Sequence, residues 1–167
     1  MADILNVTVG SPLQNEKQEL FIQGTDSDDT ITNSGAAVSI SGGAGADSIK
    51  NNGVYRYNQD GESELENYGS KVSISGGDGA DVIENTGNDA TIEGGAGDDT
   101  IINNGTNYTY SDENDEGAEI LLQQGYNVSI TGGAGADSIN NSGDNVTIRA
   151  GDGADSIVNS GSNVFFQ

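Results

Sequence analysis

The stretch GGAGADSINNSGDNVTIRAGDGADSIVNSGSNVFFQ at residues 132–167 decides the fold, because it repeats two nine-residue units in strict alternation. The first unit, GGAGADSIN at 132–140, is rich in glycine and has Asp at its sixth position. The second unit, NSGDNVTIR at 141–149, begins with Asn and has Val at its sixth position. The full period is 18 residues, and a fixed period of this kind indicates a stack of repeated structural units.

Copies of both units recur towards the N-terminus. Glycine-type copies lie at 24–31, 42–49, 76–83 and 94–101, and Asn-type copies lie at 33–41 and 85–93, with a weak match at 15–23. Two further Asn-type units are interrupted, by 16 extra residues after NNG at 51–53 and by 20 after NNG at 103–105. We therefore expect one domain over 1–167, with an N-terminal cap at 1–14, coils over 15–167, and insertions within 54–71 and 106–127.

The eighth position of the thirteen units is Ile in twelve and Phe166 in the last. A β-branched residue at one fixed phase predicts a short strand with an inward side chain. The six glycine-rich residues before each strand predict a turn. The sequence thus predicts an all-β fold, a right-handed parallel β-roll or β-solenoid with 18 residues per coil, six to seven coils and two hairpin-like insertions.

Composition excludes several classes of function. The chain has 5 basic and 27 acidic residues, a net charge of −22, and neither Cys nor His. A disulfide scaffold and any site that needs thiolate or imidazole are therefore excluded. Nucleic acid is a poor partner for so negative a surface, no apolar run is long enough for a membrane span, and the first ten residues do not resemble a secretory signal peptide.

Stacking would bring the sixth-position aspartates into one file along one edge. Carboxylates about 5 Å apart repel strongly unless a cation lies between neighbours. Glycines allow backbone carbonyl oxygens to converge on the same place, and a donor set made only of oxygen suits Ca²⁺. Six turns leave five intervals, so we expect about five Ca²⁺ ions. The candidate metal ligands are Asp29, Asp47, Asp81, Asp99, Asp137 and Asp155, with the glycine loops at Gly42, Gly43, Gly45, Gly76, Gly77, Gly79, Gly94, Gly95, Gly97, Gly132, Gly133, Gly135, Gly151 and Gly153.

The glycine-type unit GGxGxDxUx resembles the calcium-binding RTX nonapeptide repeat, over half of each coil along 24–158. The resemblance implies a β-roll with Ca²⁺ held between successive turns by the Asp and by loop carbonyls. It also implies export from a bacterium without an N-terminal signal, and folding outside the cell. The Asn-type turns depart from the family, because Val or Ala replaces the sixth-position Asp and Asn stands first. We expect these stacked Asn side chains to form a hydrogen-bonded ladder, the alternative being a second row of calcium ligands.

The two insertions contain every tyrosine of the chain: Tyr55, Tyr57, Tyr68, Tyr108, Tyr110 and Tyr126. Each insertion is expected to form a hairpin, and both leave the same edge of the roll. Tyrosine rings near Asn, Gln and Asp suit a neutral sugar, whose apolar face stacks on the ring and whose hydroxyls bind the polar groups. The alternative is structural: Tyr-x-Tyr pairs strands that pack over the flat face of the roll.

Together these features favour a calcium-binding, non-catalytic module of a secreted bacterial protein that binds neutral polysaccharide through its insertions. The alternative is a calcium-dependent spacer, or a folding-and-secretion module, beside an enzyme or adhesin domain. Ice binding is disfavoured because the outward Ser and Thr file is mixed and interrupted, and catalysis because no turn offers a sheltered acid–base pair. The chain stops at Phe166–Gln167 without a visible cap, so we expect it to be attached to further domains.

Overall fold

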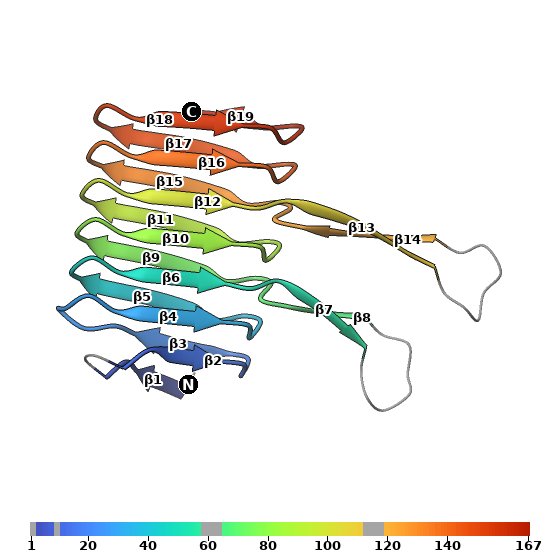
Figure 1. The fold of residues 1–167 in the computed structure, drawn as a ribbon, viewed down its shortest axis with the longest axis horizontal. Helices are drawn as coiled ribbons and strands as arrows, with labels where there is room; N and C mark the ends of the chain where they lie inside the picture. Colours follow the sequence, from blue (N-terminus) through green and yellow to red (C-terminus); the bar gives the residue numbers. More distant parts are fainter. Residues whose placement is uncertain (1–2, 9–10, 58–64, 112–118) are drawn as a thin grey trace.

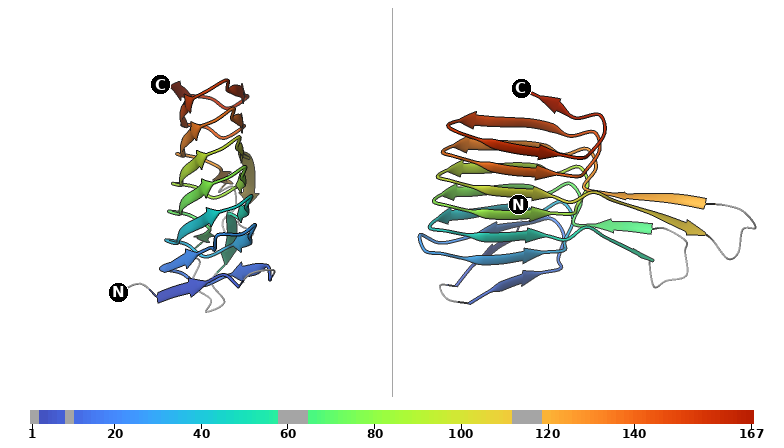
Figure 2. Two further views of the ribbon diagram at one scale, coloured as in Figure 1. Left: turned by 90° about the vertical axis from the view of Figure 1, so that its left-hand side faces the viewer. Right: turned by 45° about the horizontal axis from the view of Figure 1, so that its top comes forward.

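The 18-residue period folds into a stack of flattened coils with one strand on each side (Figure 1). The computed structural model describes residues 3–8, 11–57, 65–111 and 119–167, and for 54–57, 65–68, 108–111 and 119–122 it describes the backbone alone. Two parallel sheets face each other, and the left view of Figure 2 shows how thin the layer between them is. The predicted all-β roll of two parallel sheets is confirmed.

The strands alternate between the two sheets. The eight-stranded sheet contains, in spatial order, β1 (Asp3–Asn6), β3 (Leu20–Gln23), β5 (Ser39–Ala44), β9 (Ser73–Asp78), β11 (Thr91–Ala96), β15 (Ser129–Ala134), β17 (Thr147–Asp152) and β19 (Phe165–Phe166). The seven-stranded sheet contains β18 (Ser156–Asn159), β16 (Ser138–Asn141), β12 (Thr100–Asn103), β10 (Val82–Asn85), β6 (Ser48–Asn51), β4 (Thr30–Asn33) and β2 (Leu13–Asn15). Within the segment expected to be a cap, β1 pairs with β3 and β2 pairs with β4.

The register keeps each phase of the repeat in its own file. Ile40 pairs with Ile74 and Ile74 with Ile92, and the opposite sheet aligns Ile49, Ile83 and Ile101 in the same way. Eleven of the twelve eighth-position isoleucines are buried, each no more than 2% exposed. Their stacked side chains form the core between the sheets, so the single Ile phase of the repeat specifies both register and burial.

The glycine-rich segments differ from the expected turns in their first half. Five strands of the larger sheet, β5, β9, β11, β15 and β17, continue through the first three residues of the glycine-type unit. Gly43, for example, has a φ of +117° and still pairs in register with Gly77. Only glycine adopts this conformation without strain, so the chain bends towards the edge while coil-to-coil pairing continues.

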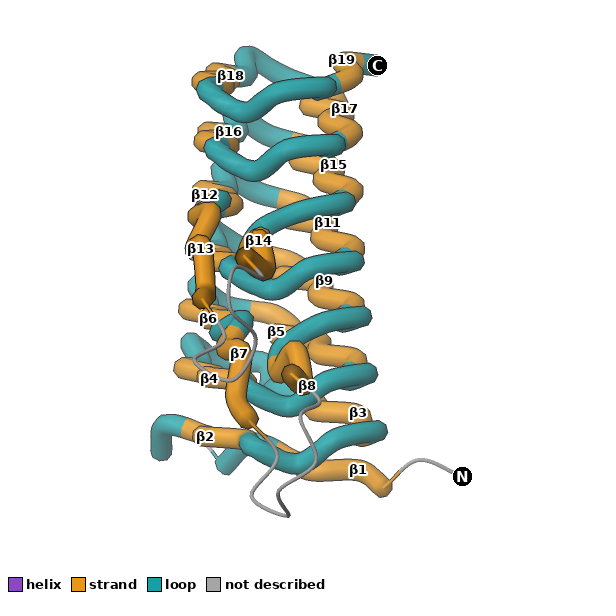
Figure 3. The backbone as a smooth tube through the Cα atoms, turned by 90° about the vertical axis from the view of Figure 1, so that its right-hand side faces the viewer, coloured by secondary structure: helices purple, strands orange, loops and turns teal. Residues whose placement is uncertain are grey.

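Both insertions form antiparallel hairpins, as predicted. The first pairs β7 (Val54–Tyr57) with β8 (Leu65–Tyr68), and the second pairs β13 (Thr106–Ser111) with β14 (Glu119–Gln124). Figures 1 and 3 show both hairpins projecting outward from the Asn-type edge, away from the two sheets. The backbone course therefore does not fit the alternative in which these segments pack over a flat face. No helix in the described residues has the length and apolarity needed to cross a bilayer.

Candidate metal centre

The six sixth-position aspartates lie in one file along the glycine-type edge, at the left of Figure 1. Each immediately precedes a strand of the seven-stranded sheet, as Asp81 precedes β10 and Asp99 precedes β12. Five of the six are only 1–3% exposed, and Asp155 in the last coil is partly exposed. A buried file of like charges is costly unless other groups neutralise it.

One carboxylate oxygen of every aspartate in the file except Asp29 ties neighbouring coils together. The backbone N–H of Asp47 donates to Oδ1 of Asp81 at 2.8 Å, and that of Asp81 donates to Oδ1 of Asp99 at 2.9 Å. The same bond joins every successive pair from Asp29 to Asp155, at 2.8–3.0 Å. This second role could not be predicted from the sequence, because the bond depends on the side-chain rotamer and on the offset between coils.

The second oxygen of the buried carboxylates has no hydrogen-bond partner among the described residues. These buried atoms are Oδ2 of Asp47, Asp81, Asp99 and Asp137, and Oδ1 of Asp29. A buried acceptor left unsatisfied costs about 1–3 kcal/mol, and more when it carries charge. Five such atoms in one file are far outside the pattern of a self-sufficient protein interior, so they require either protons or cations.

A backbone carbonyl oxygen of the next coil lies near the same place as Oδ2 of Asp47, Asp81, Asp99 and Asp137. A Cβ added to Gly76 would lie 2.3 Å from Asp81 Oδ2 and 2.5 Å from the carbonyl oxygen of Gly94 in the next coil. Gly42, Gly94 and Gly132 have the same surroundings, at 2.2–2.4 Å from the carboxylate oxygen and 2.2–2.5 Å from the next carbonyl oxygen. The first glycine of each unit is therefore needed for space, because any side chain would occupy the place where the two kinds of oxygen converge.

Burial shifts the acidity of the file. Removal from water is the largest cause that raises the pKa of Asp99 to about 6; the Asp81 N–H opposes the rise, and the charges of Asp81 and Asp137 contribute to it. The pKa of Asp47 is raised to about 6 for the same leading reason, and that of Asp81 is raised by burial. The ionised file is thus unfavourable by itself, which is the electrostatic state that a bound divalent cation would relieve.

The available donors fit calcium. They are carboxylate and carbonyl oxygens, which Ca²⁺ accepts in sets of six to eight. Within the described residues no cluster of three or more acidic, His or Cys side chains forms a metal site of side chains alone. Backbone carbonyls would therefore have to supply much of the coordination, as the converging glycine loops allow.

The other predicted glycines shape the turn. The glycines at the second and fourth positions of the unit all have φ between +108° and +143°. They are Gly43, Gly77, Gly95, Gly133 and Gly151 at the second position, and Gly45, Gly79, Gly97, Gly135 and Gly153 at the fourth. A Cβ on Gly79 would lie 2.0 Å from the carbonyl oxygen of Gly45 in the preceding coil. These positions therefore keep the loops stacked at backbone distance.

The first turn, at 24–29, has a different hydrogen-bond pattern. Thr25 replaces the second glycine, and its backbone N–H and hydroxyl both donate to Asp29 Oδ2, at 2.6 and 3.0 Å. Part of the Asp29 carboxylate is therefore satisfied by protein groups. The intervals between Asp47 and Asp137 are the most regular part of the candidate site.

The opposite edge carries the predicted Asn ladder, which is confirmed. Asn33 Nδ2 donates to Asn51 Oδ1 at 2.8 Å and to the Gly35 carbonyl at 2.8 Å, while Asn33 Oδ1 accepts from Asn15 Nδ2 and from the Gly35 N–H. The chain of amide-to-amide bonds continues through every first-position Asn to Asn159. Because the oxygen lone pairs serve the ladder, this edge is not arranged as a second row of calcium ligands.

The hairpins leave and rejoin the ladder without interrupting it. Asn51 Nδ2 donates to Gly69 O across the first insertion, and Asn103 Nδ2 donates to Gly125 O across the second. Gly69 and Gly125 thus take the place that Gly35 has in an uninterrupted turn. The two insertions are therefore additions to intact coils.

Of the six tyrosines proposed to bind sugar, Tyr126 alone has a described side chain. It is half-buried at the root of the second hairpin, and its hydroxyl accepts a hydrogen bond from Asn145 Nδ2 at 2.6 Å. Tyr55, Tyr57, Tyr68, Tyr108 and Tyr110 lie on hairpin strands whose backbone is described, and their side chains lie outside the described part.

A stack of parallel coils with a file of partly satisfied carboxylates on one glycine-rich edge defines a cation-binding β-roll. The RTX calcium-binding nonapeptide repeat matches residues 23–51, 117–148 and 131–164. These matched stretches are RTX calcium-binding nonapeptide repeats, which confirms the resemblance noted in the glycine-type unit. Comparison with curated proteins and with solved structures found no significant match.

Proposed function

We propose that this chain is a non-catalytic module that folds around calcium, with about one Ca²⁺ in each of the five intervals between the six aspartates. The observation that carries the proposal is the set of five buried carboxylate oxygens without hydrogen-bond partners. From Asp47 onward, Oδ1 of each Asp would hold the neighbouring coil, and the second oxygen would bind the ion together with the loop carbonyls. Five divalent ions would bring the net charge from −22 to about −12.

Calcium binding and folding are expected to be coupled. The site forms only when successive coils stack, so the binding free energy adds to the free energy of folding. RTX repeats are typical of secreted bacterial proteins, and we extend this to propose that the chain is secreted. Extracellular calcium would then drive folding after export.

For the insertions we propose binding of neutral polysaccharide. The hairpins project from one edge and are fixed to the turn between them: the Gly53 N–H donates to Thr86 Oγ1, and the Gly125 N–H donates to the Thr86 carbonyl. Gln124 Nε2 also donates to the Gly53 carbonyl, which links the two roots directly. Two arms held at fixed spacing on a rigid scaffold suit an extended ligand. The alternative remains a spacer or secretion module whose only ligand is calcium.

Two measurements test these proposals in order. Far-UV circular dichroism in calcium and in excess chelator should show a β-rich spectrum that collapses when calcium is removed, and an unchanged spectrum in chelator would reject calcium-coupled folding. Retention of the calcium-loaded chain on neutral polysaccharides then separates the two readings of the insertions. A folded chain that is retained on none of them is a spacer.

A further inference from the structure

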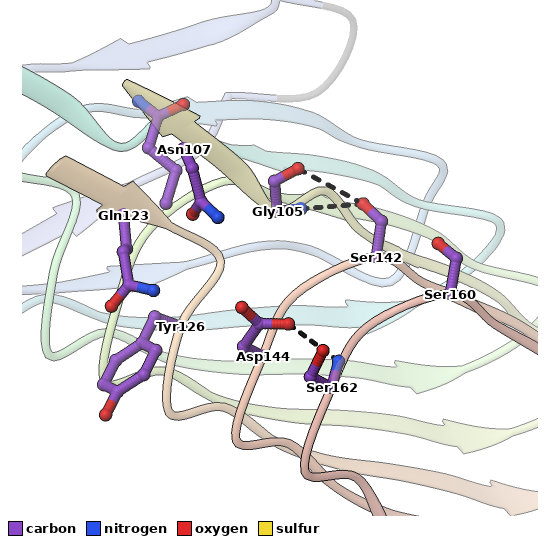
Figure 4. A pocket seen from close by; sticks show the side chains of 9 residues that line it. Gly105, Asn107, Gln123, Tyr126, Ser142, Asp144, Ser160 and Ser162 are labelled. Atoms are coloured by element: carbon purple, nitrogen blue, oxygen red, sulfur yellow. Dashed lines mark hydrogen bonds between the residues drawn. The ribbon is translucent and has the colours of Figure 1, made fainter. Parts of the chain in front are cut away.

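A polar pocket of about 250 Å³ lies at the root of the second hairpin, on the side facing the C-terminal coils (Figure 4). Its wall includes Asn107 of β13 and Tyr126 at the point where the hairpin returns to the coil. Its floor is formed by Ser142 and Asp144 of the next coil, and by Ser160 and Ser162 of the coil after that. None of these residues is a candidate calcium ligand.

The hairpin creates this pocket by interrupting a regular stack of turns. Chain that leaves the coil after Gly105 and returns at Gly125 runs outward, while the two following coils continue as tight turns. The Gly105 N–H donates to Ser142 Oγ at 2.8 Å, which fixes the root of β13 against the floor. The pocket is therefore held on ordered backbone.

The first hairpin provides an internal comparison, because the corresponding space is filled by protein. Asn88 occupies the position of Asp144 one coil beyond that hairpin. Its Nδ2 donates to the Gln123 carbonyl at 2.6 Å, and its Oδ1 accepts from the Tyr126 N–H at 3.0 Å. The second hairpin thus supplies the polar partners at the first position, whereas the space beside Asp144 is left as a pocket.

The polar groups at Asp144 indicate what could occupy that space. Asp144 Oδ1 accepts from the Ser162 N–H at 2.7 Å, which fixes the carboxylate and leaves Oδ2 to the pocket side (Figure 4). Tyr126 is held by its bond from Asn145, and the serine hydroxyls of the floor both donate and accept. The lining combines one aromatic ring, one carboxylate, amides and hydroxyls.

This lining selects by charge. An anionic ligand would meet Asp144 without a basic residue in the lining and would approach a chain of net charge −22. A bare divalent cation would find a single carboxylate there, since the described residues contain no cluster of three acidic side chains. A neutral polyhydroxyl ligand fits, because its hydroxyls can donate to the Asp144 carboxylate and exchange hydrogen bonds with the amides and serine hydroxyls of the lining.

We propose that this pocket binds one sugar unit of a neutral polysaccharide, with Asp144 accepting hydroxyl hydrogen bonds and Tyr126 forming part of the wall. The inference rests on the proposed carbohydrate function and assigns it to the hairpin root. The volume lies just below the roughly 300 Å³ at which sites for drug-sized ligands begin, which is consistent with a single ring.

The test is affinity electrophoresis of the calcium-loaded chain through gels containing a soluble β-1,4-glucan, an α-1,4-glucan or a galactomannan. Asp144→Asn keeps an oxygen for the Ser162 N–H but removes the charge, and Tyr126→Ala removes the ring. Asp89→Asn is the matched control: Asp89 lies on the same edge outside the pocket, where its Oδ1 accepts from Asn127 Nδ2. Thermal unfolding in calcium verifies that each variant is folded.

We expect Asp144→Asn and Tyr126→Ala each to weaken retention about tenfold or more, with Asp89→Asn unchanged. If the parent chain is retained and both pocket variants are retained equally well, the pocket assignment is wrong while carbohydrate binding stands. If the folded parent chain is retained by none of the three polysaccharides, carbohydrate binding is rejected together with the pocket.

Discussion

Asp99→Asn should change stability in opposite directions with and without calcium. The amide keeps an oxygen that can accept the Asp81 N–H, a bond of 2.9 Å in the parent structure. It removes the buried charge, and its N–H group can donate towards the nearby carbonyl of Gly132, which borders the same cradle. The variant should therefore resemble one rung of the Asn ladder and lose calcium ligation.

The size of each effect follows from the site. Burial raises the pKa of Asp99 from 3.8 to about 6, so its ionisation costs the calcium-free fold about 3 kcal/mol at pH 7. Asn avoids that cost. In calcium at about one hundred times Kd, each site adds about 2.7 kcal/mol, and Asp99 borders two intervals. The variant should thus be up to about 3 kcal/mol more stable in chelator and about 2 kcal/mol less stable in calcium.

Urea unfolding followed by far-UV circular dichroism at pH 7 measures both values, with trimethylamine N-oxide added equally to both proteins if the calcium-free state is too unstable to titrate. Asp144→Asn, on the opposite edge, serves as a control for the general loss of one negative charge. Equal destabilisation of Asp99→Asn in chelator and in calcium would refute the reasoning, because it would mean that the Asp99 carboxylate accepts a hydrogen bond and does not bind calcium.

Further predictions concern pH and three other positions. The raised carboxyl pKa values mean that the calcium-free fold binds more protons than the unfolded chain, so thermal melts in chelator should show stability falling as pH rises from about 4 to about 6; a flat profile would contradict this. Gly94→Ala should reduce the number of bound calcium ions and the calcium-induced stabilisation by the share of the sites beside Asp99, because its Cβ would lie 2.4 Å from Asp99 Oδ2, and unchanged calcium binding would contradict the cradle. Asn85→Ala should lower the urea-unfolding free energy by about 3 kcal/mol or more, since it leaves several buried partners unsatisfied, whereas Asn159→Ala at the exposed end should cost under about 1 kcal/mol. Lys71→Gly should raise the melting temperature, because Lys71 has a φ of +54°, a conformation in which L-residues are strained. A lower melting temperature would contradict this, since contacts of the Lys side chain would then outweigh the relief of strain.

The sequence was sufficient to predict the features that depend on a residue's position within the nine-residue unit. Ile at the eighth position of twelve of the thirteen units predicted both the register and the core, and the 16 and 20 extra residues predicted where the hairpins leave and return. The Asn ladder also followed from phase alone, because stacking identical side chains fixes their neighbours.

Features that depend on rotamers and on three-dimensional offset could not be predicted. The bond from the Asp47 N–H to Asp81 Oδ1 joins residues 34 apart and requires one side-chain conformation. Continuation of β5 through Gly43 required a backbone conformation that a turn signal does not specify. The pocket beside Asp144 exists because two uninterrupted Asn-type turns follow the second hairpin, whereas only one, at 85–93, follows the first hairpin before the next insertion fills the space, a difference that no single motif specifies.

The central claim is that calcium ions bind the unsatisfied carboxylate oxygens along the Asp file. They would thereby link neighbouring coils, as the hydrogen bonds donated by the Asn side-chain amides do along the Asn ladder. The most direct test of this claim is native mass spectrometry of the chain in a calcium titration, with circular dichroism recorded on the same samples. The account predicts about five bound ions per chain and β structure that grows with their number. Full β structure before any calcium has bound would contradict it.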